Sequence, residues 1–445
     1  MIWGLHPAFG FLPLIVYIVL SFMGWDVTLV LLISVIIGAI MTGTGLFAFG
    51  QSIGAGLGSF LGMIGFLILL GAGVGEVLTQ TKVAHYIVWL VMDKLRVNNL
   101  KRAQIAVMAS SFIIVALLGS MAGGNAILAP IVIPIVAALQ MTPSTLAVLL
   151  HGAGATGLFL GPFVPPVVTT LALAKISYFQ YLIYTGIPVS VLVWLVTYFM
   201  ALRVQKVTAG KYAYTAEEIG IGESTPSGGT PEFINPKTKR ALIAFSAAML
   251  LMVVFGIVTK AGAAYVITVM LVLSFVTGKA AGLTVNESLK AMVRGGTRMY
   301  WIFFMFILYE PFLIYINKSG AFNWMTKLMT PYLQGSGKGL LLFATTIIGM
   351  VGIPGAAVAH EKIINDLFGT LASAAGIPSY IWAIALLVAS QICFFLFPTG
   401  DIIGQMGLAR SKDLISMMKQ GFLVSVVIVL YLGLISLLLQ FGLIF

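Results

Sequence analysis

Residues 119–177 decide how this chain folds, and they read GSMAGGNAILAPIVIPIVAALQMTPSTLAVLLHGAGATGLFLGPFVPPVVTTLALAKIS. The stretch is almost free of charge, as a membrane span would be, but glycines and prolines interrupt it repeatedly. Each proline removes a backbone donor and clashes with the preceding helical turn. In lipid, freed backbone groups are tolerated only where protein covers them or where they line a water-filled cavity. We therefore predict a re-entrant hairpin with its tip near Gly123, Gly124 and Asn125, followed by a helix broken between Gly161 and Pro166.

Composition restricts the chain to one class of protein. Of its 445 residues, 60% are hydrophobic and only 8% are charged, and its mean hydropathy is +1.09. A soluble domain carries about 25% charged residues, and the apolar runs are too long for the alternating strands of a membrane β-barrel. We therefore expect an all-α polytopic membrane protein, and the N-terminal sequence MIWGLHPAFG lacks the features of a removable signal peptide.

The positive charge and the single cysteine fit the same class. The net charge is +11, but the lysines and arginines lie mainly in short breaks between apolar runs. That pattern is the topology signal of an inner or plasma membrane protein rather than a surface for nucleic acid. Cys393 stands alone, so it has no partner for an internal disulfide. The sequence has no Walker loop, CxxC or His/Cys cluster, so we expect no cofactor.

The apolar runs divide the chain into two membrane halves. We expect an N-terminal half over 1–202, a polar linker over 203–240 and a C-terminal half over 241–445. Runs of about 20 apolar residues span a bilayer, and Lys82 to Leu95 is expected to form an interfacial helix. The expected spans lie at roughly 9–24, 27–49, 59–80, 103–119, 177–202, 240–259, 262–280, 298–317, 337–352 and 414–444, with a second interrupted region over 352–413.

An internal repeat relates the two halves. Matching residues recur 235 positions apart, and this offset aligns Asn125 with His360. Glu76 and Glu310 lie 234 apart, and we expect both to be structural, pairing with basic loops. With the linker on one side of the membrane, equivalent spans run in opposite directions, which predicts an inverted-topology repeat with binding at the midplane. The matched positions are Pro143 with Pro378, Ala174-Lys175 with Ala409-Arg410, Gly186 with Gly421 and Ser190 with Ser425, while Pro162 and Pro398 match with one extra residue.

Basic residues predict the orientation. Three clusters fall at Lys94 to Arg102, within the linker, and at Lys279 to Arg298. Placing all three in the cytoplasm leaves both termini outside.

The interrupted regions supply the candidate binding residues. Open half-helix ends offer amide donors to an anion and bare carbonyls to a cation, and hydroxyls beside a break bind a carboxylate or satisfy freed carbonyls. The alternative is that the glycines only permit close helix packing. The predicted substrate-binding residues are Ser120, Gly123, Gly124, Asn125, Gly161, Pro162, Thr169, Thr170, Gly355, His360 and Thr399.

Ionisable residues in the second interrupted region are candidates for coupling, because charges inside a membrane are costly and usually functional. Asp401 directly follows the Pro398–Gly400 break and is the first choice for a cation or proton site, with Asp366 and Glu361 next. A sodium ion is predicted near Asn125 and Asp401. Glu361 and Lys362 neutralising each other is the alternative for that pair.

These features together resemble the ion transporter superfamily. The order of a Gly/Ser/Asn-rich tip, an apolar run with Pro130 and Pro134, and then TGLFLGPFVPP is similar to that of gluconate and citrate permeases, TRAP-transporter large membrane subunits and NhaC-type antiporters. The resemblance implies an inverted-repeat elevator transporter that places its hairpin tips at the substrate and works as a homodimer or beside a scaffold.

The predicted function is cation-coupled uptake, with Na⁺ or H⁺, of a small organic anion, a carboxylate, across the lipid bilayer. The alternative is an Na⁺/H⁺ antiporter in which Asp401, Asp366 or Glu361 carries the alternating charge. A membrane enzyme is disfavoured because the sequence has no HExxH or GxSxG motif. A receptor or scaffold would not need matched breaks in both halves.

Overall fold

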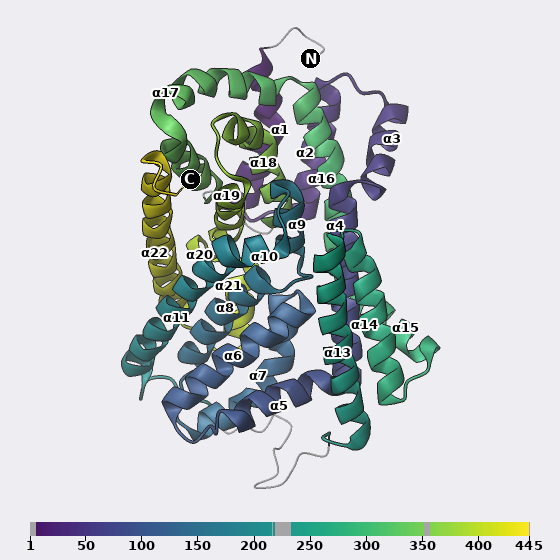
Figure 1. Ribbon diagram of the computed structural model, residues 1–445, viewed down its shortest axis with the longest axis vertical. Helices are drawn as coiled ribbons and strands as arrows, with labels where there is room; N and C mark the ends of the chain where they lie inside the picture. Colours follow the sequence, from purple (N-terminus) through teal and green to yellow (C-terminus); the bar gives the residue numbers. More distant parts are fainter. Residues whose placement is uncertain (1–5, 216, 219–232, 351–356, 445) are drawn as a thin grey trace.

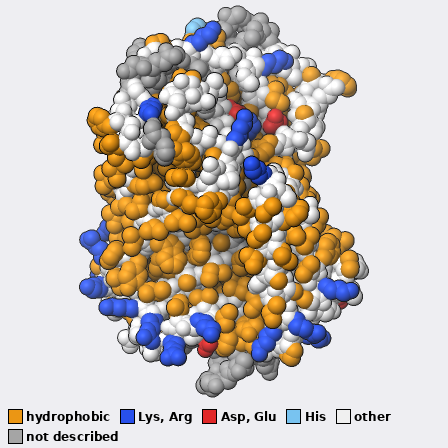
Figure 2. Space-filling view, in the orientation of Figure 1, with side chains coloured by type: hydrophobic (Ala, Val, Ile, Leu, Met, Phe, Trp, Pro, Cys, Tyr) orange, Lys and Arg blue, Asp and Glu red, His pale blue; other side chains and the backbone are white. Residues whose placement is uncertain are grey.

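The computed structural model describes residues 6–215, 217–218, 233–350 and 357–444, and these residues form helices and connecting loops, with no strand among them. Nine helices in the described ranges are long and apolar enough to cross a membrane. Figure 2 shows a broad band of hydrophobic side chains, with most of the visible Lys and Arg along its lower edge. The protein is therefore an all-α polytopic membrane protein, as the composition predicts.

The first half begins several of its helices with side-chain caps, which satisfy backbone N–H groups that have no partner in the first turn. Asp26, Ser59 and Asn99 each accept a hydrogen bond from a backbone N–H two or three residues into the helix they precede. In chain order the first half contains a 3₁₀ turn (Pro7–Phe11), α1 (Leu12–Phe22), α2 (Val27–Met41), α3 (Leu46–Leu57), α4 (Phe60–Gln80), α5 (Val83–Lys94), α6 (Leu100–Leu118), α7 (Met121–Ala138), α8 (Pro143–Leu160), α9 (Pro165–Ala174), α10 (Tyr178–Tyr181), a π-helical turn (Leu182–Gly186) and α11 (Ile187–Thr208).

The second half repeats much of this order, and its first helix is capped by Asn235. Its elements are α13 (Pro236–Thr259), α14 (Tyr265–Ala281), α15 (Val285–Thr297), α16 (Tyr300–Lys318), α17 (Ala321–Met350), α18 (Ala357–Ala374), α19 (Ser379–Gln391), α20 (Cys393–Leu396), α21 (Gly400–Leu408) and α22 (Leu414–Gln440).

Three predicted elements differ in the structure. The span expected over 27–49 is two helices, because α2 ends at Met41 and Gly43 turns the chain with φ +66°. The basic loop before the span expected at 298–317 contains the separate helix α15, which a capping box of Thr284 and Glu287 begins. The span expected at 337–352 is the last part of α17, which starts at Ala321 and is kinked at Gly337.

The first hairpin also differs from its prediction. Its turn lies at Gly119, with φ +66°, and at Ser120, so Gly123, Gly124 and Asn125 lie in the first two turns of α7 rather than at the tip. The same helix continues through Pro130 and Pro134 to Ala138, where the sequence predicts breaks. Proline inside a membrane helix is tolerated when neighbouring helices satisfy or cover the freed backbone groups, and α7 packs against α5, α6, α8 and α21.

The two halves pack in matching ways. The hairpin of α6 and α7 packs on α8, and α17 and α18 pack on α19 in the corresponding arrangement. The short helix after each break contacts the long helix of the other half, since α9 packs against α19 and α21 packs against α8. Figure 1 shows α6 and α7 toward one end of the molecule and α17 and α18 toward the other. This exchange of contacts brings the broken regions of both halves together at the centre.

Candidate functional site

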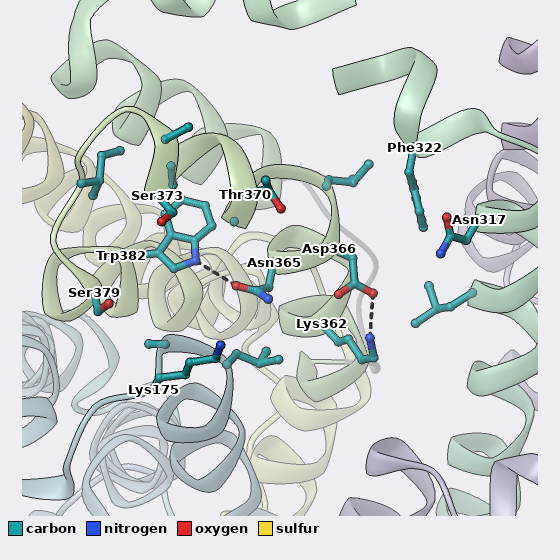
Figure 3. Close-up of a pocket in the computed structure, with 18 of the residues that line it drawn as sticks. Lys175, Asn317, Phe322, Lys362, Asn365, Asp366, Thr370, Ser373, Ser379 and Trp382 are labelled. Carbon is teal, nitrogen blue, oxygen red and sulfur yellow. Dashed lines mark hydrogen bonds and ion pairs between the residues drawn. The ribbon is translucent and has the colours of Figure 1, made fainter. Parts of the chain in front are cut away.

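A cavity of about 1000 Å³ lies where the end of α9 meets α16, α18 and the start of α19 (Figure 3). Its walls come from both halves of the chain, and carboxyl, amine, amide, hydroxyl and indole groups line it among apolar side chains. The polar side chains that line the cavity are Lys175, Glu310, Asn317, Asn323, Lys362, Asn365, Asp366, Thr370, Ser373, Ser379 and Trp382.

Two lysines line this cavity, and only one of them, Lys362, is paired with a carboxylate. The Nζ atom of Lys362 lies 2.7 Å from Oδ2 of Asp366, one helical turn further along α18. The side chain of Lys175 forms no ion pair or hydrogen bond with the described residues, and Figure 3 shows it on the same side of the cavity as Lys362. The acid Glu310 belongs to the α16 wall and likewise pairs with no described group. The cavity therefore offers a free ammonium group from α9 and free acceptors from α16.

Trp382 fixes the amide group of Asn365 between these charges. The indole Nε1 of Trp382 donates to Oδ1 of Asn365 at 3.0 Å. This hydrogen bond occupies the amide oxygen of Asn365 and leaves its amino group to donate elsewhere. Together with the hydroxyls of Thr370, Ser373 and Ser379, the wall formed by α18 and α19 presents neutral hydrogen-bonding groups beside the charged ones.

Lys175 reaches the cavity because of how α9 ends. The helix closes at Ala174, and Lys175 takes the left-handed conformation with φ +55° while its N–H bonds the carbonyl of Leu171. That conformation costs a non-glycine residue about 1–2 kcal/mol. A cation beside a helix C-terminus is favoured by the helix dipole, which offsets part of the cost.

Asn125, a predicted binding residue, joins helices in this conformation. Its side chain is fully buried, and Oδ1 accepts a hydrogen bond of 2.7 Å from the hydroxyl of Ser111 on α6. Its Nδ2 donates to the carbonyl of Leu150 on α8 at 3.0 Å and to Oε1 of Gln405 on α21 at 2.7 Å. All the hydrogen-bonding groups of Asn125 are engaged, so it connects the first hairpin to the short helix of the second half.

The neighbouring glycines and Ser120 shape this junction. Ser120 caps α7 by accepting from the N–H of Gly123 at 3.1 Å. A Cβ atom on Gly124 would lie 3.0 Å from a methyl group of Val115, so glycine here permits α7 to approach α6 closely. These three predicted binding residues do not line the cavity.

Glu361 is the counterpart of Asn125 in the second half. Helices α7 and α18 end 236 residues apart, at Ala138 and Ala374, and this offset pairs Asn125 with Glu361. The offset of 235 that pairs Asn125 with His360 therefore does not hold for this helix. Helices α8 and α19 also begin 236 residues apart, whereas α9 and α21 begin 235 apart, so the one-residue difference lies in the helix break. Glu361 is fully buried, and its Oε1 accepts hydrogen bonds from Thr170 at 2.6 Å and from Ser390 at 3.2 Å.

Two further predictions about this segment are corrected. Lys362 pairs with Asp366 and not with Glu361, because the ammonium and the Asp366 carboxylate lie one turn apart on the same face of α18. His360 turns toward α17, where its Nε2 lies 2.8 Å from the carbonyl of Gly349. Gly355 lies outside the described residues. Asp366 and its partner Lys362 line the cavity, whereas Glu361 and His360 do not.

The first predicted helix break is present. Helix α8 ends at Leu160, and α9 begins at Pro165. A Cβ on Gly161 would lie 2.5 Å from the carbonyl oxygen of Ala116, so the break passes close to the first hairpin. Pro162 lines a second cavity of about 490 Å³ between α9 and α13, whereas Thr169 is buried and its hydroxyl has no described partner.

The second break places Thr399 and Asp401 at the start of α21. Thr399 is the N-cap residue of this helix, and Asp401 lies in its first turn, half-buried, where the helix dipole favours a carboxylate. Asp401 does not line the cavity beside α18, and the structure does not bring it into hydrogen-bond contact with Asn125. In the described ranges no group of three or more His, Cys, Asp or Glu side chains is arranged to hold a metal ion.

The cavity residues were largely missed by the sequence analysis. Lys175 appears there only as a marker of the repeat, and Glu310 only as a structural acid. Glu76 does pair with the basic segment as expected, at 3.0 Å from Arg298 and 3.8 Å from Arg294. The position of Lys175, alone and directly after the short helix that follows a break, was a signal for this one residue but not for the cavity as a whole.

Comparison with known proteins gives two similarities. A family model for GntP family permeases matches residues 8–228, whereas the curated proteins contain no match. The YdaH transporter of Alcanivorax borkumensis, whose crystal structure shows an unusual topology, has a similar fold with a TM-score of 0.57 and 14% identity over 89% of this chain and 90% of that chain. The family match over the first half and the shared fold over most of the chain together support a multi-pass secondary transporter.

Proposed function

We propose that this protein is a cation-coupled secondary transporter that takes up a small organic anion, a carboxylate, with Na⁺ or H⁺ as the coupling ion. A gluconate-like hydroxy acid is the first substrate to test, since the family match suggests that class. Transport by an elevator motion and assembly as a homodimer belong to the same proposal.

The observation that carries the proposal is the unpaired Lys175 in a cavity built from both halves of the chain. An ammonium group attracts a carboxylate. The free acceptors Glu310 and Asn317 on the opposite helix suit the hydroxyl groups of a hydroxy acid. The chemistry of the cavity therefore matches an anionic head with a polar tail.

The position of the cavity supports an alternating-access mechanism. Its walls are α16 on one side and the broken region formed by α9, α18 and α19 on the other. Movement of the broken region against α16 would open and close the cavity while the hydrogen bond between Asn125 on α7 and Gln405 on α21 holds. Inverted repeats in transporters use such rocking or sliding around a central site.

Ligand-dependent stability tests the proposal directly. Purified protein is heated with hydroxy carboxylates at several sodium concentrations and pH values, because a ligand stabilises the state that it binds. The substrate should raise the unfolding temperature of the wild type, and Lys175→Gln should weaken its affinity by at least tenfold. Arg96→Gln is the matched control, since Arg96 is also a left-handed cation at a helix end but is absent from the cavity lining. Equal affinities of wild type and Lys175→Gln would contradict this site.

An Na⁺/H⁺ antiporter is the second candidate, and the buried Glu361 and half-buried Asp401 favour it, because acids within a membrane bundle carry exchangeable cations in such proteins. Liposomes that contain the protein and a pH-sensitive dye distinguish the two functions. Sodium-driven proton movement without any organic acid would establish the antiporter, and proton or sodium movement that requires the organic acid would establish the symporter.

A further inference from the structure

The carboxyl group of Glu361 occupies an unusual environment. It is fully buried between three helices of the two halves, with α9 contributing Thr170 and α19 contributing Ser390. Both hydroxyls lie within hydrogen-bond distance of the same oxygen, Oε1, and each shares its single proton with a carbonyl of its own helix, that of Pro166 or Leu387. Oε2 has no hydrogen-bond partner among the described residues. The site thus supplies two neutral donors on one side of the carboxyl group and none on the other.

The charged groups around Glu361 are engaged elsewhere. On its own helix, His360 contacts the carbonyl of Gly349 and Lys362 pairs with Asp366. No described cation lies within ion-pair distance of the Glu361 carboxyl group. The described ionisable groups on the elements that pack against α18 are Lys175 at the end of α9, Tyr300, Tyr309, Glu310, Tyr315 and Lys318 on α16, Lys327 and Lys338 on α17, and Tyr380 on α19. Tyr181 on α10 also lies near Glu361, and its hydroxyl donates to the carbonyl of Phe159.

An ionised carboxylate in this place would be unstable. Removing a carboxylate from water costs several kcal/mol even after relaxation, and the cost is recovered only by a close counter-charge with further hydrogen bonds. Two hydroxyl donors at 2.6 and 3.2 Å supply part of that compensation for one oxygen only. A proton on Oε2 removes the charge, so the packed site favours the neutral acid.

The counterpart residue in the first half leads to the same conclusion. Asn125 occupies the equivalent place on α7 with a neutral amide, whose Nδ2 donates a hydrogen bond to Gln405 on α21. In the second half, Glu361 accepts the corresponding hydrogen bond from Thr170 on α9. Gln405 and Thr170 are themselves 235 residues apart. Both halves therefore place a neutral group at this junction, but only Glu361 can become charged when the junction opens to water.

We propose that Glu361 is the proton carrier of this transporter, protonated while α18 is packed against α9 and α19 and deprotonated when that junction opens. The proton is bound to a carboxylate oxygen from water on one side of the membrane and released from the same oxygen to water on the other side. The next residue, Lys362, lines the cavity, which gives water a short route to the carboxyl group once α18 moves. The proposal rests on the proposed transport function and selects the proton as its coupling ion.

Glu361→Gln tests this role, because glutamine keeps the size and hydrogen-bonding character of the neutral acid but cannot release a proton. The variant should fold, bind the organic anion and exchange it across liposomes preloaded with the same anion. It should lose accumulation driven by a pH gradient, at least tenfold relative to the wild type. Glu287→Gln, at an exposed carboxyl group in the cap of α15, is the control and should accumulate normally. Accumulation by Glu361→Gln at the wild-type level would overturn the proposal.

A substrate-independent measurement separates this inference from the proposed function. The infrared spectrum of purified wild type at neutral pH should contain the carbonyl band of a protonated carboxyl group that disappears in Glu361→Gln and persists in Asp401→Asn. If no organic anion binds the wild type but this band is found, the proposed substrate is wrong and the protonated Glu361 stands. If the anion binds and exchanges but the band is unchanged in Glu361→Gln, the transport function stands and the proton carrier is another group.

Discussion

Replacing Asn125 with alanine should separate the first hairpin from the second half of the chain. The change removes three hydrogen bonds, to Ser111, Leu150 and Gln405. Each contributes about 1 kcal/mol net, but Ser111 keeps a second acceptor in the carbonyl of Leu150 at 3.3 Å. The side chain of Gln405 would then have no described hydrogen-bond partner, because Asn125 is the partner of its Oε1 and its Nε2 has none. We therefore expect a loss of about 2–3 kcal/mol in the free energy of unfolding.

A double-mutant cycle isolates the contact between the halves. Unfolding of purified Asn125→Ala, Gln405→Ala and the double variant is followed by denaturant titration, with Gln51→Ala at an exposed site on α3 as the control. Residues that share a hydrogen bond show coupling of about 0.5–3 kcal/mol, and we expect about 1 kcal/mol here. Strictly additive effects would refute the view that this amide pair holds the halves together. A stable Asn125→Ala that only loses substrate binding would instead favour the direct binding role predicted from the sequence.

Three other predictions concern the frame around the site. Gly161→Ala should lower the free energy of unfolding by about 1–3 kcal/mol or prevent folding, because the new Cβ would lie 2.5 Å from a carbonyl oxygen of α6. Gly45→Ala, in open space with a similar extended backbone, is the control and should be nearly neutral in the same unfolding measurement. Glu76→Gln should lower the free energy of unfolding by about 1–2 kcal/mol, because it removes the buried carboxylate that pairs with Arg298. High salt should reduce the difference between this variant and the wild type. A cysteine at Lys211, just after α11, should resist an impermeant reagent added outside intact cells, because the linker is predicted to be cytoplasmic, and ready labelling would reverse the orientation.

The helix break at Gly161 was predictable because its cause is local. Gly161, Pro162, Pro165 and Pro166 leave the backbone few helical options, and α8 does end at Leu160 before α9 begins. Long apolar helices such as α4 and α22 were equally predictable, since length and hydropathy alone define them. The same physical rule applied to Pro130 and Pro134 gave a wrong result. Whether a membrane helix breaks at proline depends on the helices around it, and those neighbours are not visible in the sequence.

The position of the hairpin turn shows a similar limit. Gly119 and Gly123 are both glycines near the expected tip, but only Gly119 has the left-handed conformation that requires one. The pairing of Asn125 with His360 failed for another reason. A single offset was applied to both sides of the helix break, which is one residue shorter in the second half, and one residue on a helix rotates a side chain by about 100°. The sequence therefore predicted His360, which faces α17, at the position that Glu361 occupies in the structure, facing α9.

The cavity itself could not have been predicted from patterns along the chain. Lys175, Glu310, Asn365 and Trp382 come from four different elements, and each is an isolated polar residue in an apolar or mixed segment. Nothing in their spacing indicates that they share one space. Only the exchange of contacts between halves, with α9 against α19 and α18, brings them together.

This exchange of contacts also explains how two similar halves can carry different chemistry. Each half donates a short helix to the other, so the polar junction at α7 and α21 and the one at α18 and α9 are built from equivalent parts. Only the second junction contains an ionisable group, Glu361, and only its neighbour Lys362 reaches the cavity. Protonation therefore acts on one junction, beside the substrate cavity, while the amide pair at the other keeps the two halves joined. A symmetric pair of glutamates would titrate at both junctions and loosen the connection that the movement needs.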